Sequence, residues 1–168
     1  MPSAVRVQLG AALGQRAAVR RRRTASSDSP AAQPIIPDVA VRRVMARAAR
    51  AALRRAQARD AEVSITLLDD TEITGMNREF LSHDRPTDVI AFALYEEGED
   101  PVGDVYVGFE QALRQADANR IDPLEELARL AVHGTLHVLG HDHPEGDDRL
   151  ESEMWQIQES IVSQVFTT

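Results

Sequence analysis

Cysteine is absent from the 168-residue sequence, which excludes disulfide bonds and thiolate metal ligands. Any metal ion would therefore be held by nitrogen and oxygen atoms alone. A chain without cysteine also suits the reducing environment of the cytoplasm, where we expect this protein to act.

Long apolar runs are absent as well. No stretch approaches the roughly 20 apolar residues that span a bilayer, so we expect no association with a membrane. The first fifteen residues contain no uninterrupted apolar segment, so we expect no secretory signal. The length fits one domain, and 43% hydrophobic with 27% charged residues is typical of a soluble globular protein.

Lysine is the third absence, because all nineteen basic residues are arginine. Residues 1–59 hold thirteen of them against two acidic residues, whereas residues 60–168 hold six against twenty-five. Arginine binds phosphate in a bidentate manner, so one hypothesis is an RNA-facing surface in the N-terminal part. The other is a solvated helix face in a protein from an arginine-biased proteome.

The first 34 residues are expected to form a poorly ordered basic extension. Residues 20–34 pass from an arginine run into Ser, Ala and Pro, so burial cannot offset the entropy of ordering them. Residues 4–9 alternate in a way that suits an edge strand, although a disordered start fits equally well. A single folded domain is then expected over residues 35–168.

Helices and strands alternate through that domain. Asp38 is predicted to cap a helix that reaches about Ala58, with an apolar face and an arginine face. The arginine face would carry Arg43, Arg47, Arg50 and Arg54. Further strands are predicted at 62–68, 89–94 and 103–109, and helices at 70–80, 110–119 and 147–166.

Asp122 and Pro123 have the composition of a helix start, and this long helix should run to Gly140. The order of the elements predicts an α+β fold. We expect a small mixed β-sheet covered by helices, with a metal site at the end of the long central helix.

Four of the five histidines lie within residues 133–143, HGTLHVLGHDH. His133 and His137 are four residues apart on the predicted long helix, so both rings leave one face of it at a spacing that suits zinc. Gly140 permits a backbone turn with positive φ, after which the chain doubles back and brings His143 toward the same point. The pattern predicts a metal site.

The spacing H-x3-H-x2-G-x2-H matches that of the metzincin proteases, but their general-base glutamate is replaced by Gly134. A metalloprotease is therefore disfavoured. Three protein ligands leave a fourth position for water, which is typical of catalytic zinc, where the metal polarises an oxygen or supplies hydroxide. His141 is expected not to be a ligand, although His141 or Asp142 could close the site or orient a ligand.

HGTLHVLGHDH resembles the signature of the YbeY family of metal-dependent endoribonucleases, H-G-x-L-H-x-x-G-[aromatic]-D-H, at every position except His141. The resemblance continues through VSITLLDD, the helix with Asn77, PTDVIAF, GDVYV and MWQIQESIV, from about Ile35 to Phe166. It implies an α+β fold and one zinc ion per chain. The ligands that it implies are His133, His137 and His143.

The same resemblance implies an activity and partners. The expected activity is cleavage of single-stranded RNA near the 3′ end of small-subunit ribosomal RNA, together with a part in ribosome quality control. The expected partners are the ribosomal RNA precursor and the small ribosomal subunit or its proteins, and no DNA is expected.

Two positions depart from the family pattern. Leu81 stands where the family normally carries an arginine that is thought to engage phosphate, and Ala91 stands at a usual serine position. Either Arg85 or Arg78 reaches the phosphate instead, or the protein acts as a ribosome assembly factor that uses its metal structurally. We favour Arg85. The expected catalytic residues are Arg85, His133 and His137.

Three other polar residues are candidates for the site. His83 is expected to lie on the surface, although it could serve as a general acid. Asp88 and Asp104 each border a predicted strand, and either line the cleft or have a structural role such as turn capping.

Overall fold

The protein is described by a computed structural model for residues 2–14, 36–144 and 146–167. Its sheet has four strands in the order β1-β2-β4-β3. Strands β1 (Ala4–Leu9), β2 (Glu62–Leu68) and β4 (Val102–Gly108) run parallel, and β3 (Val89–Ala93) pairs antiparallel with β4. The predicted α+β class with a small mixed sheet is confirmed.

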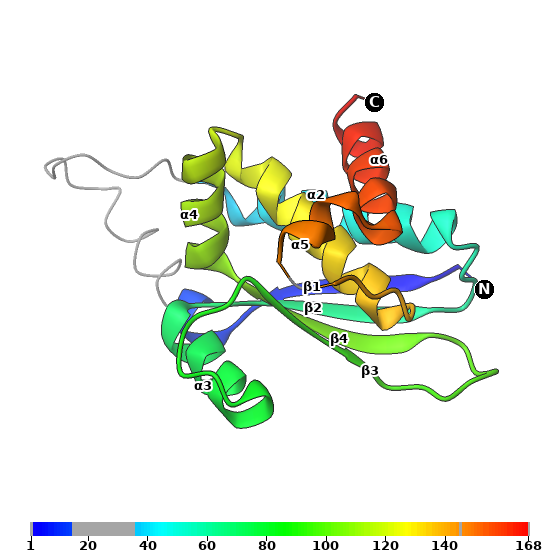
Figure 1. The fold of residues 1–168 in the computed structure, drawn as a ribbon, viewed down its shortest axis with the longest axis horizontal. Helices are drawn as coiled ribbons and strands as arrows, with labels where there is room; N and C mark the ends of the chain where they lie inside the picture. Colours follow the sequence, from blue (N-terminus) through cyan, green and yellow to red (C-terminus); the bar gives the residue numbers. More distant parts are fainter. Residues whose placement is uncertain (1, 15–35, 145, 168) are drawn as a thin grey trace, which may run out of the picture.

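Helices cover the sheet unequally (Figure 1). One face carries α2 (Asp38–Arg55), α4 (Phe109–Asn119), α5 (Pro123–Val138) and α6 (Glu153–Thr167), while α3 (Asp70–Leu81) lies on the other. Helix α5 is central, because it contacts the other three helices of its layer and also β3 and β4. Across the described ranges, none of the helices is long and apolar enough to cross a membrane.

The main core lies between this helical layer and the sheet. Val63, Ile65 and Leu67 of β2 alternate inward as predicted, and each is at most 2% exposed. The apolar faces of α2, α5 and α6 meet them, and each large apolar side chain buried this way contributes roughly 1.5–3 kcal/mol. A smaller cluster of Leu68, Ile73 and Ile90 lies on the α3 side.

Two predicted helix starts were wrong. Asp38 does not cap α2; the helix begins at Asp38 with Pro37 as its N-cap residue, and the Asp38 carboxylate accepts a hydrogen bond from Arg42 Nε at 2.9 Å instead. The last helix begins at Glu153, after a short 3-10 helix, η1 (Asp147–Glu151). The extended backbone at Ser152 separates the two, and its hydroxyl accepts a hydrogen bond from the Trp155 backbone amide.

Strand β1 forms the edge of the sheet beside β2, which is the position that the alternating pattern of residues 4–9 allowed. Its outer edge is covered by α2, since Arg42 Nη1 donates to the Val7 carbonyl at 2.8 Å and Arg50 Nη2 donates to the Val5 carbonyl at 3.4 Å. The arginine- and proline-containing segment 20–34 lies outside the described residues, so the extent of the basic extension stays a prediction.

Candidate metal centre

Helix α5 is fixed at both ends by local sequence. Asp122 Oδ1 accepts a hydrogen bond from the Leu124 backbone amide at 2.7 Å, and Pro123 occupies the first turn, as predicted. At the other end Gly140 has φ 89°, and the amides of Gly140 and His141 donate to the carbonyls of residues 137 and 136. These paired bonds are a Schellman motif, which reverses the chain after α5.

Gly134 lets α5 approach the sheet closely. A Cβ atom built at this position would lie 2.3 Å from Val105 Cγ1 of β4 and 3.2 Å from Val89 Cγ2 of β3. Real Cβ atoms essentially never approach within 3.0 Å, so a larger residue there would push the helix off the sheet. The residue that follows the first histidine of the motif is therefore determined by packing.

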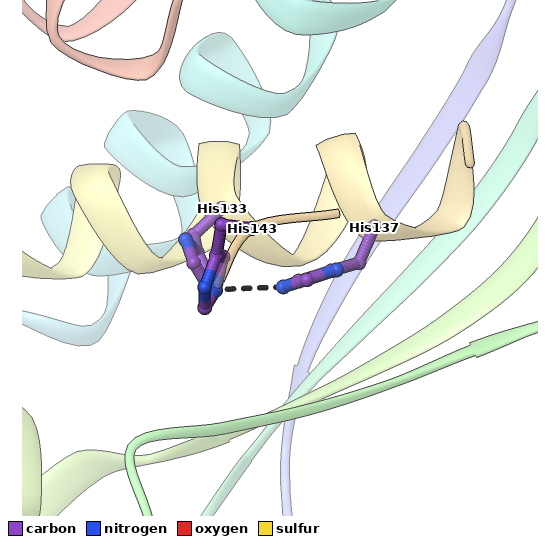
Figure 2. Close-up of side chains that lie close together, drawn as sticks. All are labelled: His133, His137 and His143. Atoms are coloured by element: carbon purple, nitrogen blue, oxygen red, sulfur yellow. Dashed lines mark hydrogen bonds between the residues drawn. The ribbon is translucent and has the colours of Figure 1, made fainter. Parts of the chain in front are cut away.

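Three histidines converge beside the end of α5, as Figure 2 shows. His133 and His137 extend from the helix, and the reversed chain brings His143 back to them. The Nε2 atom of His133 lies 3.1 Å from Nε2 of His137, drawn as a dashed line, and 3.4 Å from Nε2 of His143. One nitrogen from each ring lies within 4.8 Å of the others, so the three residues could hold a metal ion.

The opposite ring nitrogens show which tautomer each histidine adopts. His137 Nδ1 donates to the His141 carbonyl at 3.0 Å, and His143 Nδ1 donates to the Pro144 carbonyl at 2.9 Å. His133 Nδ1 lies 2.7 Å from Gln158 Oε1. With all three Nδ1 atoms carrying the proton, each Nε2 atom presents a lone pair to the shared point.

Gln158 of α6 was missed by sequence reasoning. Its side chain is 1% exposed, and its Nε2 donates to Glu159 Oε1 at 3.1 Å, which leaves Oε1 as the acceptor for His133. Arg129 in turn donates to both carboxylate oxygens of Glu159. The amide is thereby held in one orientation by a chain of contacts that begins at Arg129. No sequence pattern marks Gln158, because it is 25 residues from His133.

Burial sets the charge state of the helix histidines. Burial lowers the pKa of His133 from 6.5 to about 4, and this effect exceeds the opposite one of the hydrogen bond that His133 donates to Gln158. The pKa of His137 is also lowered, by burial first and then by the neighbouring His143. Both rings are therefore neutral at pH 7, which is the form that coordinates a metal.

His141 and Asp142 affect the three-histidine centre only through other residues. The backbone carbonyl of His141 orients His137, while its side chain lines a separate pocket with Tyr95 and Ile157. Asp142 Oδ1 accepts a hydrogen bond from the His143 amide at 2.8 Å and so shapes the returning turn.

The two aspartates at strand borders lie on different faces. Asp88 caps the start of β3 through the Val89 amide and accepts from Gln115 Nε2, and its charge raises the pKa of both helix histidines, so it lies on the metal side. Asp104 neighbours Val105, which packs against Gly134, so alternation turns Asp104 to the α3 face.

The two candidate phosphate ligands, Arg78 in the last turn of α3 and Arg85 in the loop that follows, differ in their partners. Arg78 donates to Asp84 through Nε and Nη2, so its guanidinium is occupied. Arg85 is exposed, and only its backbone carbonyl is used, by Asn77 Nδ2 at 2.9 Å. Within the described part of the chain, neither a hydrogen bond nor an ion pair joins the Arg85 guanidinium to another residue. Leu81 and His83 are exposed.

Comparison with known proteins assigns the chain to a family. The family model described as endoribonuclease YbeY matches residues 31–165. The chain belongs to the YbeY family. Endoribonuclease YbeY of Desulfitobacterium hafniense (strain Y51) is 41% identical over 127 residues, 70% of this chain and 80% of that protein. Endoribonuclease YbeY of Azorhizobium caulinodans is 41% identical over 130 residues, 75% of this chain and 80% of that protein.

A solved structure shows the same fold. The solution structure of TM1509 from Thermotoga maritima matches with a TM-score of 0.53 at 23% identity, and the match covers 98% of this chain and 90% of that one. Members of the YbeY family are named for endoribonuclease activity, the cutting of RNA within the chain. The family match begins at residue 31, so β1 lies outside it.

Proposed function

We propose that this protein is a zinc-dependent endoribonuclease that cleaves single-stranded RNA. Its proposed role is maturation of the 3′ end of small-subunit ribosomal RNA and ribosome quality control, in the cytoplasm. The observation that carries this proposal is the arrangement of His133, His137 and His143, whose Nε2 lone pairs meet at one point while their Nδ1 atoms donate to oxygen. Family membership supplies the substrate class.

The spacing of the Nε2 atoms supports zinc. Two nitrogens that each lie about 2.0–2.1 Å from a tetrahedral zinc are about 3.3–3.4 Å apart. The Nε2 separations from His133 are 3.1 and 3.4 Å. Lone pairs this close repel one another unless a cation lies between them, and a cysteine-free site of neutral imidazoles suits zinc. We therefore assign the three histidines as ligands of one zinc ion.

Zinc held in this way supplies Lewis-acid chemistry, either by polarising a phosphoryl oxygen or by activating water. The residues of the chain supply orientation. Gln158 and the carbonyls of residues 141 and 144 keep each ligand in the coordinating tautomer. Asp88 places a negative charge beside His133 and His137.

Arg85 is our assignment for holding the phosphate. An exposed guanidinium without a carboxylate partner can take a phosphate group without first breaking an ion pair, whereas Arg78 would have to leave Asp84. Loss of an arginine that stabilises developing charge costs several kcal/mol of transition-state energy, on the order of 100- to 1000-fold in rate. Leu81 itself cannot supply this charge.

Two other functions are alternatives to the proposed endoribonuclease. A metalloprotease needs a general base where Gly134 stands, and the contact with Val105 leaves no room for a side chain there. A ribosome assembly factor with a structural metal is favoured by one observation, the exposed Leu81 at the usual arginine position.

The decisive experiment compares zinc-loaded wild type, His137→Ala and Arg85→Gln on a labelled single-stranded RNA from the 3′ region of the small-subunit precursor. We expect His137→Ala to abolish cleavage and Arg85→Gln to slow it at least roughly 100-fold. His83→Ala, a change at an exposed histidine of the same loop, is the matched control and should cleave normally.

The outcomes distinguish the endoribonuclease from the ribosome assembly factor. Absence of cleavage by fully metallated wild type, with retained binding to the small ribosomal subunit, would replace the nuclease with the assembly factor. Full activity of Arg85→Gln would remove Arg85 from the site but leave the histidine centre in place.

A further inference from the structure

Helix α2 carries a stripe of arginines on its exposed side. Arg43, Arg47, Arg50 and Arg54 are all exposed, while the opposite face, with Val41, Met45 and Ala48, is buried in the core. At 100° per residue the four arginines fall within about 60° around the helix axis, and they extend over about 16 Å along it. We call these four residues the arginine stripe.

The arginine stripe contains no acidic residue to balance it. Asp38 is the acidic residue of α2, and it pairs with Arg42 outside the stripe. In the part of the chain that the structure describes, no ion pair reaches Arg43, Arg47, Arg50 or Arg54. Three neighbouring like-charge pairs at i,i+3 and i,i+4 destabilise a helix, so the stripe is a cost to folding.

Two surface arginines outside α2 are paired with carboxylates. Arg114 donates to both oxygens of Asp70, and Arg78 donates to Asp84. The acidic residues of segment 60–168 outnumber its arginines by twenty-five to six, so this segment repels RNA on average. Because neutralisation of phosphates provides most nonspecific affinity for RNA, the affinity has to come from a basic surface elsewhere.

The arginine stripe is separated from the metal centre by the width of the sheet. Arg50 reaches the Val5 carbonyl of β1, which is one edge strand, whereas Gly134 of α5 packs on β4 and β3 at the other edge. Three strand spacings of about 4.8 Å separate the two edges. A single ligand that contacts both places must therefore be extended, and the four arginines favour a polyanion.

We propose that the arginine stripe is a docking surface for the phosphate backbone of RNA, remote from the metal centre. The inference rests on the proposed function for its choice of RNA as the polyanion. Arginine suits this task, since its planar guanidinium binds phosphate with two parallel hydrogen bonds. The stripe anchors a long RNA while the histidine centre acts on a separate stretch of the same molecule.

The test measures RNA binding without cleavage, in the full chain carrying His137→Ala. The stripe variant combines Arg43→Gln, Arg47→Gln and Arg54→Gln, and leaves Arg50 in place because it bonds to β1. A control with the same change in net charge combines Arg114→Gln, Arg120→Gln and Arg149→Gln, at arginines outside α2, of which the first two are exposed and Arg149 is half-buried. Affinity for a labelled 40-nucleotide RNA is measured across a range of salt concentrations.

The stripe variant should bind roughly tenfold or more weakly at 0.15 M salt, and the slope of log K against log salt should fall by about 2, near 0.7 per lost phosphate contact. The control variant should change both quantities much less. Circular dichroism and thermal unfolding would show that both variants are folded.

Three results would overturn the proposal: equal weakening in both variants, no weakening in the stripe variant, or a stripe variant that loses binding to anionic phospholipid vesicles but keeps its affinity for RNA. A separate assay with a six-nucleotide RNA, in the background with His137 intact, distinguishes the two proposals. Failure of the wild type to cut this short RNA would contradict the proposed nuclease. If the stripe variant cuts the short RNA normally but binds the long RNA weakly, the docking surface is distinct from the metal centre.

Discussion

Helices α5 and α2 pack against each other, yet they treat charge in opposite ways. On α5, Arg129 donates to Glu125, Glu126 and Glu159, and His133 is bonded to Gln158. On α2, the arginine stripe faces solvent without an acidic partner in the described residues. The difference indicates that α5 holds groups in fixed positions at short range, whereas α2 acts through a field that extends into solvent.

Removal of one arginine from each helix should give very different losses of stability. Arg129→Ala leaves the carboxylate of Glu126, which is 5% exposed, buried without its partner, and this should cost about 3–5 kcal/mol. Arg47→Ala removes an exposed side chain that has no ion pair within the described residues, and it should change stability by less than about 0.5 kcal/mol. Urea denaturation of both variants measures the contrast. Similar losses of unfolding free energy in both variants would mean that the arginines of α5 and α2 contribute equally to stability.

Acid should weaken the metal-free protein through His133. Its folded pKa of about 4 lies below the ordinary 6.5, so the unfolded chain takes up a proton first as the pH falls. The contribution of neutral His133 is complete above pH 6.5 and is lost toward pH 4, by about 3 kcal/mol at most. The charges of His137, Asp88 and His143 also act on the His133 ring.

The measurement is the free energy of unfolding of the metal-free protein from pH 7.5 to 4. His133→Asn should flatten the curve within this window, while His83→Asn, at an exposed loop position, should leave it unchanged. A wild-type curve that does not fall between pH 6.5 and 4 would contradict the neutral, buried state of His133.

Gln158→Ala should weaken zinc binding roughly 10- to 100-fold, because it removes the acceptor that holds His133 in the coordinating tautomer. Gln156→Ala is the matched control, since Gln156 is exposed on the same helix. Competition with a chelator of known affinity gives the zinc dissociation constant. An unchanged constant in Gln158→Ala would show that His133 does not depend on its α6 partner.

The smallest expected effect is a gain in stability. Arg47→Glu replaces like-charge neighbours of Arg43 and Arg50 with opposite charges, which should stabilise α2 by about 0.2–0.5 kcal/mol per pair at low salt. Thermal unfolding at low and high salt would detect the gain and its screening. If the variant is less stable than wild type, the arginine stripe has a structural role and the contrast with α5 weakens.

Most of the fold could be predicted because its elements are marked locally. The alternation of Val63, Ile65 and Leu67, the helix start at Asp122 and Pro123, and the turn at Gly140 depend on residues within a few positions of one another. The two wrong helix starts also have local causes, because a nearby hydrogen bond overrides the sequence pattern at each. Asp38 pairs with Arg42 rather than capping α2, and Ser152 starts α6 later than its apolar pattern suggested.

The candidate site was predictable only in part. The i,i+4 spacing of His133 and His137 places two rings on one face of a helix whatever surrounds it. The buried amide of Gln158, the separation of Asp88 from Asp104 onto opposite faces, and the absence of a described partner for the Arg85 guanidinium all required the packed chain. Each of these depends on contacts between elements far apart in the sequence.

The sequence by itself excluded thiolate ligands, because it has no cysteine, and it predicted a histidine metal site by gathering four histidines around a helix end and a glycine turn. Only the tertiary structure decided which ring nitrogens face one another, since α6 and two backbone carbonyls orient the rings. It also decided that Gly134 must stay small, because β4 lies against it. Local backbone geometry follows from neighbouring residues, whereas orientation and close packing follow from how distant elements meet.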